Sequence, residues 1–203
     1  MKIECVQEKL KQAINLTGKV AGKHMTLPVL SCLLLDASSK NTLTIRATNL
    51  DLGMEISIPA KIQENGIIAV PSQILNSFMD GVMGDDSGIR LETDQNNLKV
   101  ITARSSGAIK TIPADDFPTI PHTDSEENKF FLNGSDFAKG LRAVWYSSSV
   151  SSIKPELSSI YIYCENEFVV FVATDSFRLA EKRVKIKKTK DLAIVDFSSL
   201  KIL

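Results

Sequence analysis

The sequence is poor in the residues that most enzymes use for metal or nucleophilic chemistry. Its 203 residues include two histidines, His24 and His122, and three cysteines that form no C-x-x-C pair. A three-histidine metal site is therefore excluded, and the nucleotide-binding, zinc-protease and serine-hydrolase patterns G-x-x-x-x-G-K-[ST], G-x-G-x-x-G, H-E-x-x-H and G-x-S-x-G do not occur. The sequence predicts no catalytic residue, no cofactor and no metal ion.

Net charge and long apolar runs are absent too. Lysine plus arginine and aspartate plus glutamate both number 24, so a strongly basic nucleic-acid binder is excluded and any DNA contact needs local basic patches. No apolar run approaches the roughly 20 residues of a membrane helix, and the N-terminus lacks a signal-peptide core. We expect a cytoplasmic protein without membrane contact, in which Cys5 and Cys32 are buried, reduced thiols.

Hydrophobic periodicity predicts a strand, a helix and three strands, repeated once, within the first 121 residues. Ala60 and Ala114 end matching stretches of the two halves and lie 54 residues apart. The fold class is therefore α+β, with two helices packed on antiparallel sheets. The predicted helices are 7–21 and 72–82, and the predicted strands are 1–6, 29–37, 42–48, 54–62, 66–70, 89–93, 97–103 and 108–113.

The same pattern starts again after residue 128. Residues 122–128 are polar and acidic and are predicted to be a linker. Beyond them we expect a strand at 129–132 and a helix that Ser135 caps, ending at Ser147. The residues predicted to face inward on this helix are Phe137, Leu141, Val144 and Trp145.

Matching residues of the two copies lie at a nearly constant distance in the sequence. Phe137 follows Leu10 by 127 residues, and Ala173-Thr174 follows Ala47-Thr48 by 126. Such an offset predicts internal duplication, with one domain at 1–121 and a second at 129–203. By the same offset Leu203 falls inside the helix that matches 72–82. We therefore expect a truncated second domain and a complete gene that continues for about 160 further residues.

Three surface features are candidates for function. Lys11, Lys19, Lys139 and Arg142 lie on polar helix faces, which are either solvated or in contact with phosphates. The lysine-rich stretch 182–190 is interpreted as an exposed strand that runs into a turn, because lysine discourages edge pairing. The acid pairs Asp85-Asp86 and Asp115-Asp116 are interpreted as solvated turns, with metal binding as the alternative.

Six short motifs, in this order and at this spacing, resemble the bacterial DNA polymerase III beta subunit, the sliding-clamp family. The resemblance covers the whole chain. The motifs are Met1-Lys2-Ile3, Thr26-Leu27-Pro28-Val29-Leu30, Ala47-Thr48-Asn49-Leu50-Asp51, Pro113-Ala114-Asp115-Asp116-Phe117-Pro118, Lys154-Pro155-Glu156-Leu157-Ser158 and Ala173-Thr174-Asp175-Ser176-Phe177-Arg178-Leu179-Ala180.

The resemblance implies the DNA-clamp fold and a non-enzymatic processivity factor. Members of the family have three such domains, of which the third is absent here, and the full-length form is a homodimeric ring. The implied partners are double-stranded DNA bound without sequence preference, the polymerase III alpha subunit, the clamp loader and other clamp-motif proteins. Two alternatives stay open: a clamp-derived peptide-binding scaffold that does not encircle DNA, and a metal-dependent enzyme using the acid pairs.

The resemblance also implies two sets of site residues. DNA-facing candidates on the inner surface are Lys23, His24, Lys139 and Arg142, joined from the helix faces by Lys11 and Lys19. The implied partner-peptide pocket comprises Lys154, Leu157, Thr174, Ser176, Phe177, Arg178 and Leu179. The family usually has glycine where Ser176 stands and arginine where Lys154 stands, so the turn and one pocket cation differ here.

Overall fold

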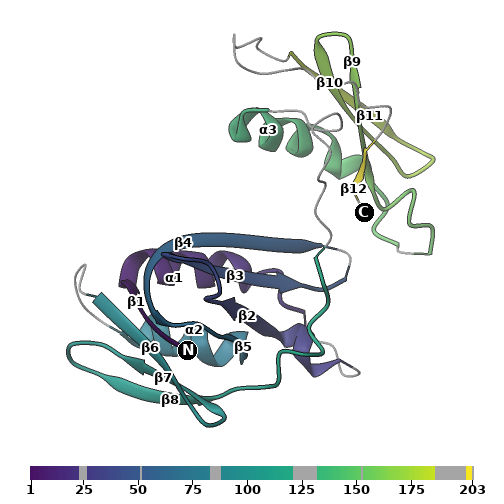
Figure 1. Cartoon of the computed structure of the whole chain (residues 1–203). Helices are drawn as coiled ribbons and strands as arrows, with labels where there is room; N and C mark the ends of the chain where they lie inside the picture. Colours follow the sequence, from purple (N-terminus) through teal and green to yellow (C-terminus); the bar gives the residue numbers. More distant parts are fainter. Residues whose placement is uncertain are drawn as a thin grey trace. The chain divides into compact units, whose positions relative to one another are not determined.

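The computed structural model describes residues 1–22, 27–50, 52–82, 88–120, 132–151, 153–185 and 200–202. The chain divides into two compact units, unit 1 at Met1–Ile120 and unit 2 at Pro121–Leu203. Figure 1 shows their elements. The predicted linker at 122–128 lies outside the described residues. No helix in the described part of the chain is long and apolar enough to cross a membrane.

The described residues of unit 1 form one eight-stranded antiparallel sheet and two α-helices, so the α+β prediction is confirmed. The strand order is β5-β2-β3-β4-β1-β6-β7-β8. The first strand of each half pairs with the other half, β1 with β6 and β5 with β2, which interlocks the halves. In chain order the elements are β1 (Lys2–Val6), α1 (Gln7–Thr17), β2 (Cys32–Asp36), β3 (Thr42–Thr48), β4 (Gly53–Glu64), β5 (Ile67–Pro71), α2 (Ser72–Gly81), β6 (Gly88–Asp94), β7 (Asn97–Ile101) and β8 (Ser106–Lys110).

The core of unit 1 lies between this sheet and the helices. Alternate residues of β1, such as Ile3, and the apolar stripe of α1, including Leu10 and Ile14, are fully buried. The predicted buried thiols are confirmed: Cys5 and Cys32 are buried and free. Burial, and then the charge of Glu4, raises the pKa of the Cys5 thiol to about 12, so this sulfur is a weak nucleophile.

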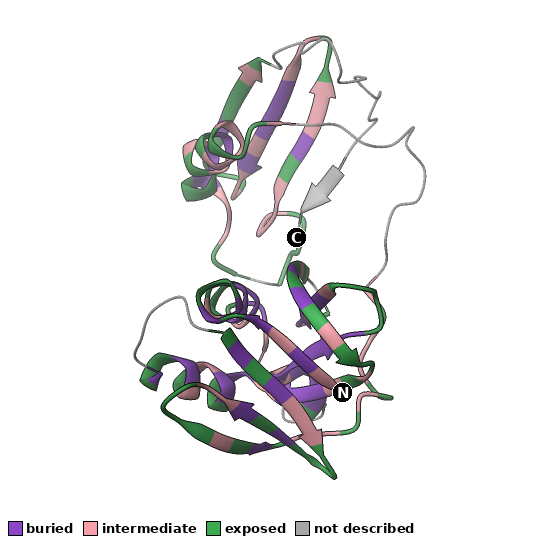
Figure 2. Ribbon diagram, turned by 60° about the vertical axis from the view of Figure 1, so that its left-hand side comes forward, coloured by how far each residue is buried: buried purple, intermediate pink, exposed green. Residues whose placement is uncertain are grey.

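Unit 2 repeats half of this architecture. Its elements are α3 (Gly134–Val144), β9 (Ile160–Glu165), β10 (Phe168–Thr174), β11 (Leu179–Lys185) and β12 (Leu200–Ile202). The sheet order β11-β10-β9-β12 reproduces β4-β3-β2-β5 of unit 1. Strand β10 is more buried than its neighbours β9 and β11, and Figure 2 shows it as a purple band between them. Phe137, Leu141 and Val144 of α3 pack onto this sheet, as predicted.

The helix predicted over 7–21 ends at Thr17, and the one predicted to reach Ser147 ends at Val144. Four further details differ from the sequence prediction. Residues 28–31 form a 3-10 turn instead of the start of a strand, because Pro28 favours a helical first turn and Ser31 donates to its carbonyl at 2.6 Å. The side chain that caps α3 is Asn133, which accepts from the backbone N–H of Ser135 at 2.9 Å. Trp145 follows the last turn of α3 and is 65% exposed, so it does not face inward.

The fourth difference concerns the end of the chain. Residues 200–202 form a strand, not the predicted helix. Leu200 pairs with Ile162 of β9 as Ile68 pairs with Leu35 of β2. Leu200 follows Ile68 by 132 residues, whereas the other matching residues are 125 to 127 apart. The second copy is therefore longer just before this strand, so the constant offset placed the wrong element there. The predicted strand at 129–132 lies outside the described residues except for Leu132, which is not in a strand.

Candidate functional site

The turn between β10 and β11 is built by side chains that bond to its own backbone. Ala173 pairs with Ala180 at its base, and Ser176 at its tip has a left-handed φ of 74°. The Thr174 hydroxyl accepts from the N–H of Ser176 at 3.1 Å and donates to the carbonyl of Arg178 at 2.7 Å. Because glycine adopts such a φ without strain, the serine at this position stores strain in the turn.

Asp175 is the centre of this turn, although it was not among the predicted site residues. Its carboxylate accepts from the backbone N–H groups of Phe177 at 2.9 Å and Arg178 at 2.7 Å. It also accepts from Nε and Nη2 of Arg178 at 2.9 and 2.8 Å. The spacing Asp-x-x-Arg was the signal that could have indicated this bidentate pair.

The hydrogen bonds to Asp175 make a specific prediction for acid. The backbone N–H of Arg178, then its guanidinium and the N–H of Phe177, lower the pKa of the Asp175 carboxyl from 3.8 to about 2. A lowered pKa means that the stabilising charge is complete above the ordinary value and is lost only as the pH falls through about 2. We expect the amide NMR signals of Phe177 and Arg178 to stay unchanged between about pH 5 and pH 3.

The matching turn of unit 1 supplies the control, because Asn49 holds the N–H of Leu52 with an amide that does not titrate. The Leu52 N–H should therefore keep this hydrogen bond at every pH at which unit 1 stays folded. Movement of the Arg178 signal with a midpoint near 4, the usual range of an aspartate, would contradict the assigned bonds.

The turns of the two units are the same structure made twice. The N–H of Leu50 donates to Thr48 Oγ1 at 3.0 Å, and the N–H of Leu52 donates to Asn49 Oδ1 at 2.7 Å. These bonds match those of Ser176 and Arg178, 126 residues later, and Leu50 has a φ of 78°. The backbone is therefore duplicated, and only the side chains that leave it differ.

The side chains that leave the unit 2 turn are apolar and exposed. Phe177 is 95% exposed and Leu179 is 68% exposed. At the positions of Phe177 and Leu179, unit 1 has Asp51 and Gly53. In unit 1 the side chain of Ile120 lies against Gly53, where a Cβ would approach Ile120 Cγ2 to 2.9 Å. The unit 2 turn thus presents apolar groups where unit 1 has none.

The other two predicted pocket residues reach the same end of the unit 2 sheet. Lys154 and Leu157 lie in the loop that precedes β9, and the carbonyl of Lys154 accepts from the N–H of Leu157 at 3.0 Å. Tyr161 at the start of β9 pairs with Val172 near the end of β10. The antiparallel register therefore places this loop beside the β10–β11 turn. Lys154 is exposed and Leu157 is half-buried.

The predicted DNA-facing residues occupy different environments. Lys139 and Arg142 are exposed on α3, and Lys139 Nζ lies 3.5 Å from Asp136 Oδ1. Lys11 is half-buried on α1, with its Nζ 3.3 Å from Asp80 Oδ1 of α2, so its charge links the two helices. Lys19 is exposed in the turn after α1, while Lys23 and His24 lie outside the described residues.

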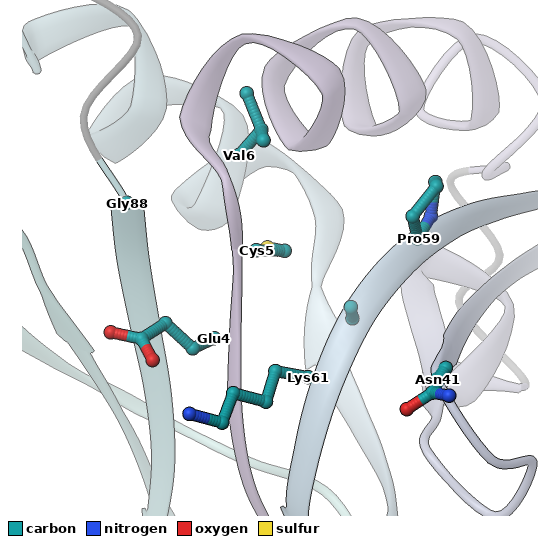
Figure 3. Close-up of a pocket in the computed structure, with 8 residues that line it drawn as sticks. Glu4, Cys5, Val6, Asn41, Pro59, Lys61 and Gly88 are labelled. Carbon is teal, nitrogen blue, oxygen red and sulfur yellow. The ribbon is translucent and has the colours of Figure 1, made fainter.

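A shallow apolar depression of unit 1 was not predicted. It has a volume of 430 Å³ and lies where β1 meets β4, beside Cys5, Val6 and Pro59. Figure 3 shows Glu4 of β1 and Lys61 of β4 together at one end of the depression. The two residues are opposite each other in the strand register. Its one thiol, that of Cys5, stays protonated at neutral pH, so the depression offers no nucleophile.

Of the two acid pairs weighed as metal ligands, the structure describes one. Asp115 and Asp116 are exposed in a turn, and Asp85 and Asp86 lie outside the described residues. The described ranges contain no group of three or more histidine, cysteine or acidic side chains arranged to hold a metal ion.

Two interlocked β-α-β-β-β halves in unit 1, and a helix followed by a sheet in the same strand order in unit 2, define a DNA-clamp fold. The similar solved structures are clamps. A putative DNA polymerase III beta subunit from Eubacterium rectale superposes with a TM-score of 0.84 at 24% identity, covering 99% of this chain and 52% of that one. The Caulobacter crescentus pol III beta superposes with a TM-score of 0.81 at 25% identity, covering 91% of this chain and 50% of that one.

Sequence comparison identifies the family. The family model for the DNA polymerase III beta subunit, N-terminal domain, matches residues 1–121, and the chain belongs to this family. The beta sliding clamp of Synechocystis sp. is 29% identical over 208 residues, which cover 98% of this chain and 53% of the relative. That of Proteus mirabilis is 28% identical over 181 residues, covering 89% and 48%. The chain spans about half the length of the curated relatives it matches.

Proposed function

We propose that this chain is part of a DNA polymerase processivity factor, a sliding clamp that encircles duplex DNA. The observation that carries the proposal is the family match over 1–121 together with a second unit built on the same plan. A ring holds DNA by topology, so the function needs no catalytic residue. The full-length form would be a homodimer acting in the cytoplasm. The scaffold alternative is not favoured, because the matched relatives are sliding clamps.

Weak phosphate contacts would suit such a ring. Lysine and arginine meet phosphates without reading the bases, which lets a protein move along the duplex. Lys139 and Arg142 support this role by their exposure on α3, and Lys19 by its exposure after α1. Lys11 would contribute less, since its Nζ lies 3.3 Å from Asp80 Oδ1 and its charge is paired there. Lys23 and His24 belong to the same proposed set.

The exposed end of the unit 2 sheet is proposed to dock partner peptides. Phe177 and Leu179 offer apolar contact area, and Arg178 is held in place by Asp175. Lys154, Leu157, Thr174 and Ser176 complete this part of the pocket. The proposed partners are the polymerase III alpha subunit, the clamp loader and other clamp-motif proteins. A clamp of the same fold from Pseudomonas aeruginosa was solved bound to griselimycin.

Leucine-to-alanine substitution in the two matching turns tests the docking proposal. We expect the 203-residue chain to bind a fluorescent peptide from the C-terminal tail of a polymerase III alpha subunit weakly, as measured by fluorescence anisotropy. Leu179→Ala should weaken this binding about fivefold, because truncating an apolar anchor of an interface costs about 1 kcal/mol.

Leu52→Ala is the matched control, since Leu52 is 52% exposed on the turn of unit 1. The Leu52→Ala variant should bind the peptide with the same affinity as the unmodified chain. Equal weakening by both substitutions, or none by Leu179→Ala, would count against the assignment of the pocket to unit 2.

A further inference from the structure

Two large aromatic side chains are exposed side by side just after α3. Trp145 is 65% exposed and Tyr146 is 60% exposed, in a 3-10 turn that continues the helix. Aromatic side chains of this size are normally buried or used for binding, because they carry a large apolar area. The proposed clamp function assigns no role to either residue.

The duplication shows that Trp145 is not simply a helix-packing residue. Helices α1 and α3 have 11 residues each and start 127 residues apart, so Trp145 stands where Gly18 stands in unit 1. Gly18 lies so close to α2 that a Cβ there would be 2.4 Å from Asn76 Nδ2 and 3.0 Å from Ser72 Oγ. An indole at that position would overlap the ends of these two side chains. A helix beside Trp145 would therefore need smaller side chains at the matching positions, or a greater distance, than α2 has beside Gly18.

Two cationic residues precede the two aromatic residues at helical spacing. Arg142 is exposed and precedes Trp145 by three residues and Tyr146 by four, the spacing at which side chains on one helix face meet. Lys139 lies one turn earlier, and its charge is shared with Asp136 at 3.5 Å. The surface is thus a strip of two cations that ends in two aromatic rings.

This combination matches the chemistry of single-stranded nucleic acid. Unpaired bases expose ring faces that stack on aromatic side chains, while cations neutralise the adjacent phosphates. The bases of a duplex are stacked on one another and offer no free ring face to this strip. The aromatic groups therefore add nothing to the proposed phosphate contacts with duplex DNA.

We propose that the strip formed by Lys139, Arg142, Trp145 and Tyr146 binds single-stranded DNA, with one or two bases stacked on Trp145 and Tyr146. The ligand class follows from the charge complementarity with phosphates and from the exposed rings. The site goes beyond the proposed encircling of duplex DNA, and it requires neither a closed ring nor the peptide pocket.

Fluorescence offers a direct test, because Trp145 is the single tryptophan of the sequence. The 203-residue chain is titrated at low salt with oligothymidylate of about 20 nucleotides, and separately with a blunt duplex of equal length. Base stacking on the indole should quench the emission with the single strand and leave it nearly unchanged with the duplex. Absence of quenching, or equal quenching by the duplex, overturns the proposal.

Variants that keep the tryptophan sharpen the test. Tyr146→Ala should weaken oligothymidylate binding about tenfold, since the stacking of one base is lost. Arg142→Ala should weaken it and also reduce its dependence on salt. Tyr161→Ala, which removes a 38% exposed tyrosine of β9, is the control and should have no effect. Unchanged affinity in Tyr146→Ala would overturn the stacking role, whatever the result of the peptide experiment.

Discussion

Replacing Phe171 by alanine is expected to lower the free energy of unfolding by about 3–5 kcal/mol, the largest effect of any single substitution proposed for this chain. Phe171 is fully buried in the middle of β10, and its ring meets that of Phe137 edge to face at 5.7 Å. The unit 2 core is small, so few neighbouring side chains can move to fill the cavity left by the ring.

Phe177 provides a control of the same residue type in the same unit. It is 95% exposed, and Phe177→Ala should change the free energy of unfolding by less than about 0.5 kcal/mol. Urea unfolding followed by circular dichroism measures both variants. Equal midpoints for the two alanine variants would show that Phe171 is not part of a packed core.

Adding a single methyl group at Gly140 is expected to lower the free energy of unfolding by about 1–3 kcal/mol. A Cβ at this position of α3 would lie 2.4 Å from Cε2 of Phe171 and 2.6 Å from two further carbons of the ring. Alanine favours helices over glycine by about 1 kcal/mol, but the overlap with a buried ring outweighs this gain. Gly134→Ala, at the start of the same helix with no atom within 4 Å, should be neutral or stabilising.

The duplication indicates which second substitution can restore the free energy of unfolding lost in Gly140→Ala. Unit 1 has Ala13 and Ile45 where unit 2 has Gly140 and Phe171, 127 and 126 residues later, and both members of each pair are buried. The smaller helix residue in unit 2 thus accompanies the larger strand residue. Phe171→Ile should therefore be less harmful with Gly140→Ala than alone, with a coupling of about 0.5–3 kcal/mol in a double-mutant cycle. Strict additivity would contradict direct contact.

Much of the fold could be predicted because the residues of the two copies match one by one. The pairs Leu10 and Phe137, and Ile14 and Leu141, occupy the same positions of α1 and α3, and all pack in their cores. Strand β3 has the predicted bounds, and most other elements end within a few residues of theirs. Buried positions recur at the period of a strand or helix, so they remain visible in one sequence.

The functional surface was predicted less completely. Sequence resemblance assigned Phe177 and Leu179 to a pocket, but the role of Asp175 depends on hydrogen bonds to backbone groups that carry no residue identity. Trp145 was predicted to be buried because it continues an apolar stripe. Exposure depends on which neighbour covers a position, and periodicity along one helix does not contain that information.

By itself, the sequence determined the duplicated α+β plan, the family and the absence of the common catalytic motifs, because each follows from residue types and their spacing. Tertiary structure alone decided how the copies differ. It showed that the turns at Leu50 and Ser176 share one backbone conformation, with φ of 78° and 74°. It also showed that Gly140 of α3 faces a buried ring, whereas Trp145, just after α3, faces solvent. These outcomes depend on contacts between residues distant in sequence, which become defined only when the sheets and helices pack.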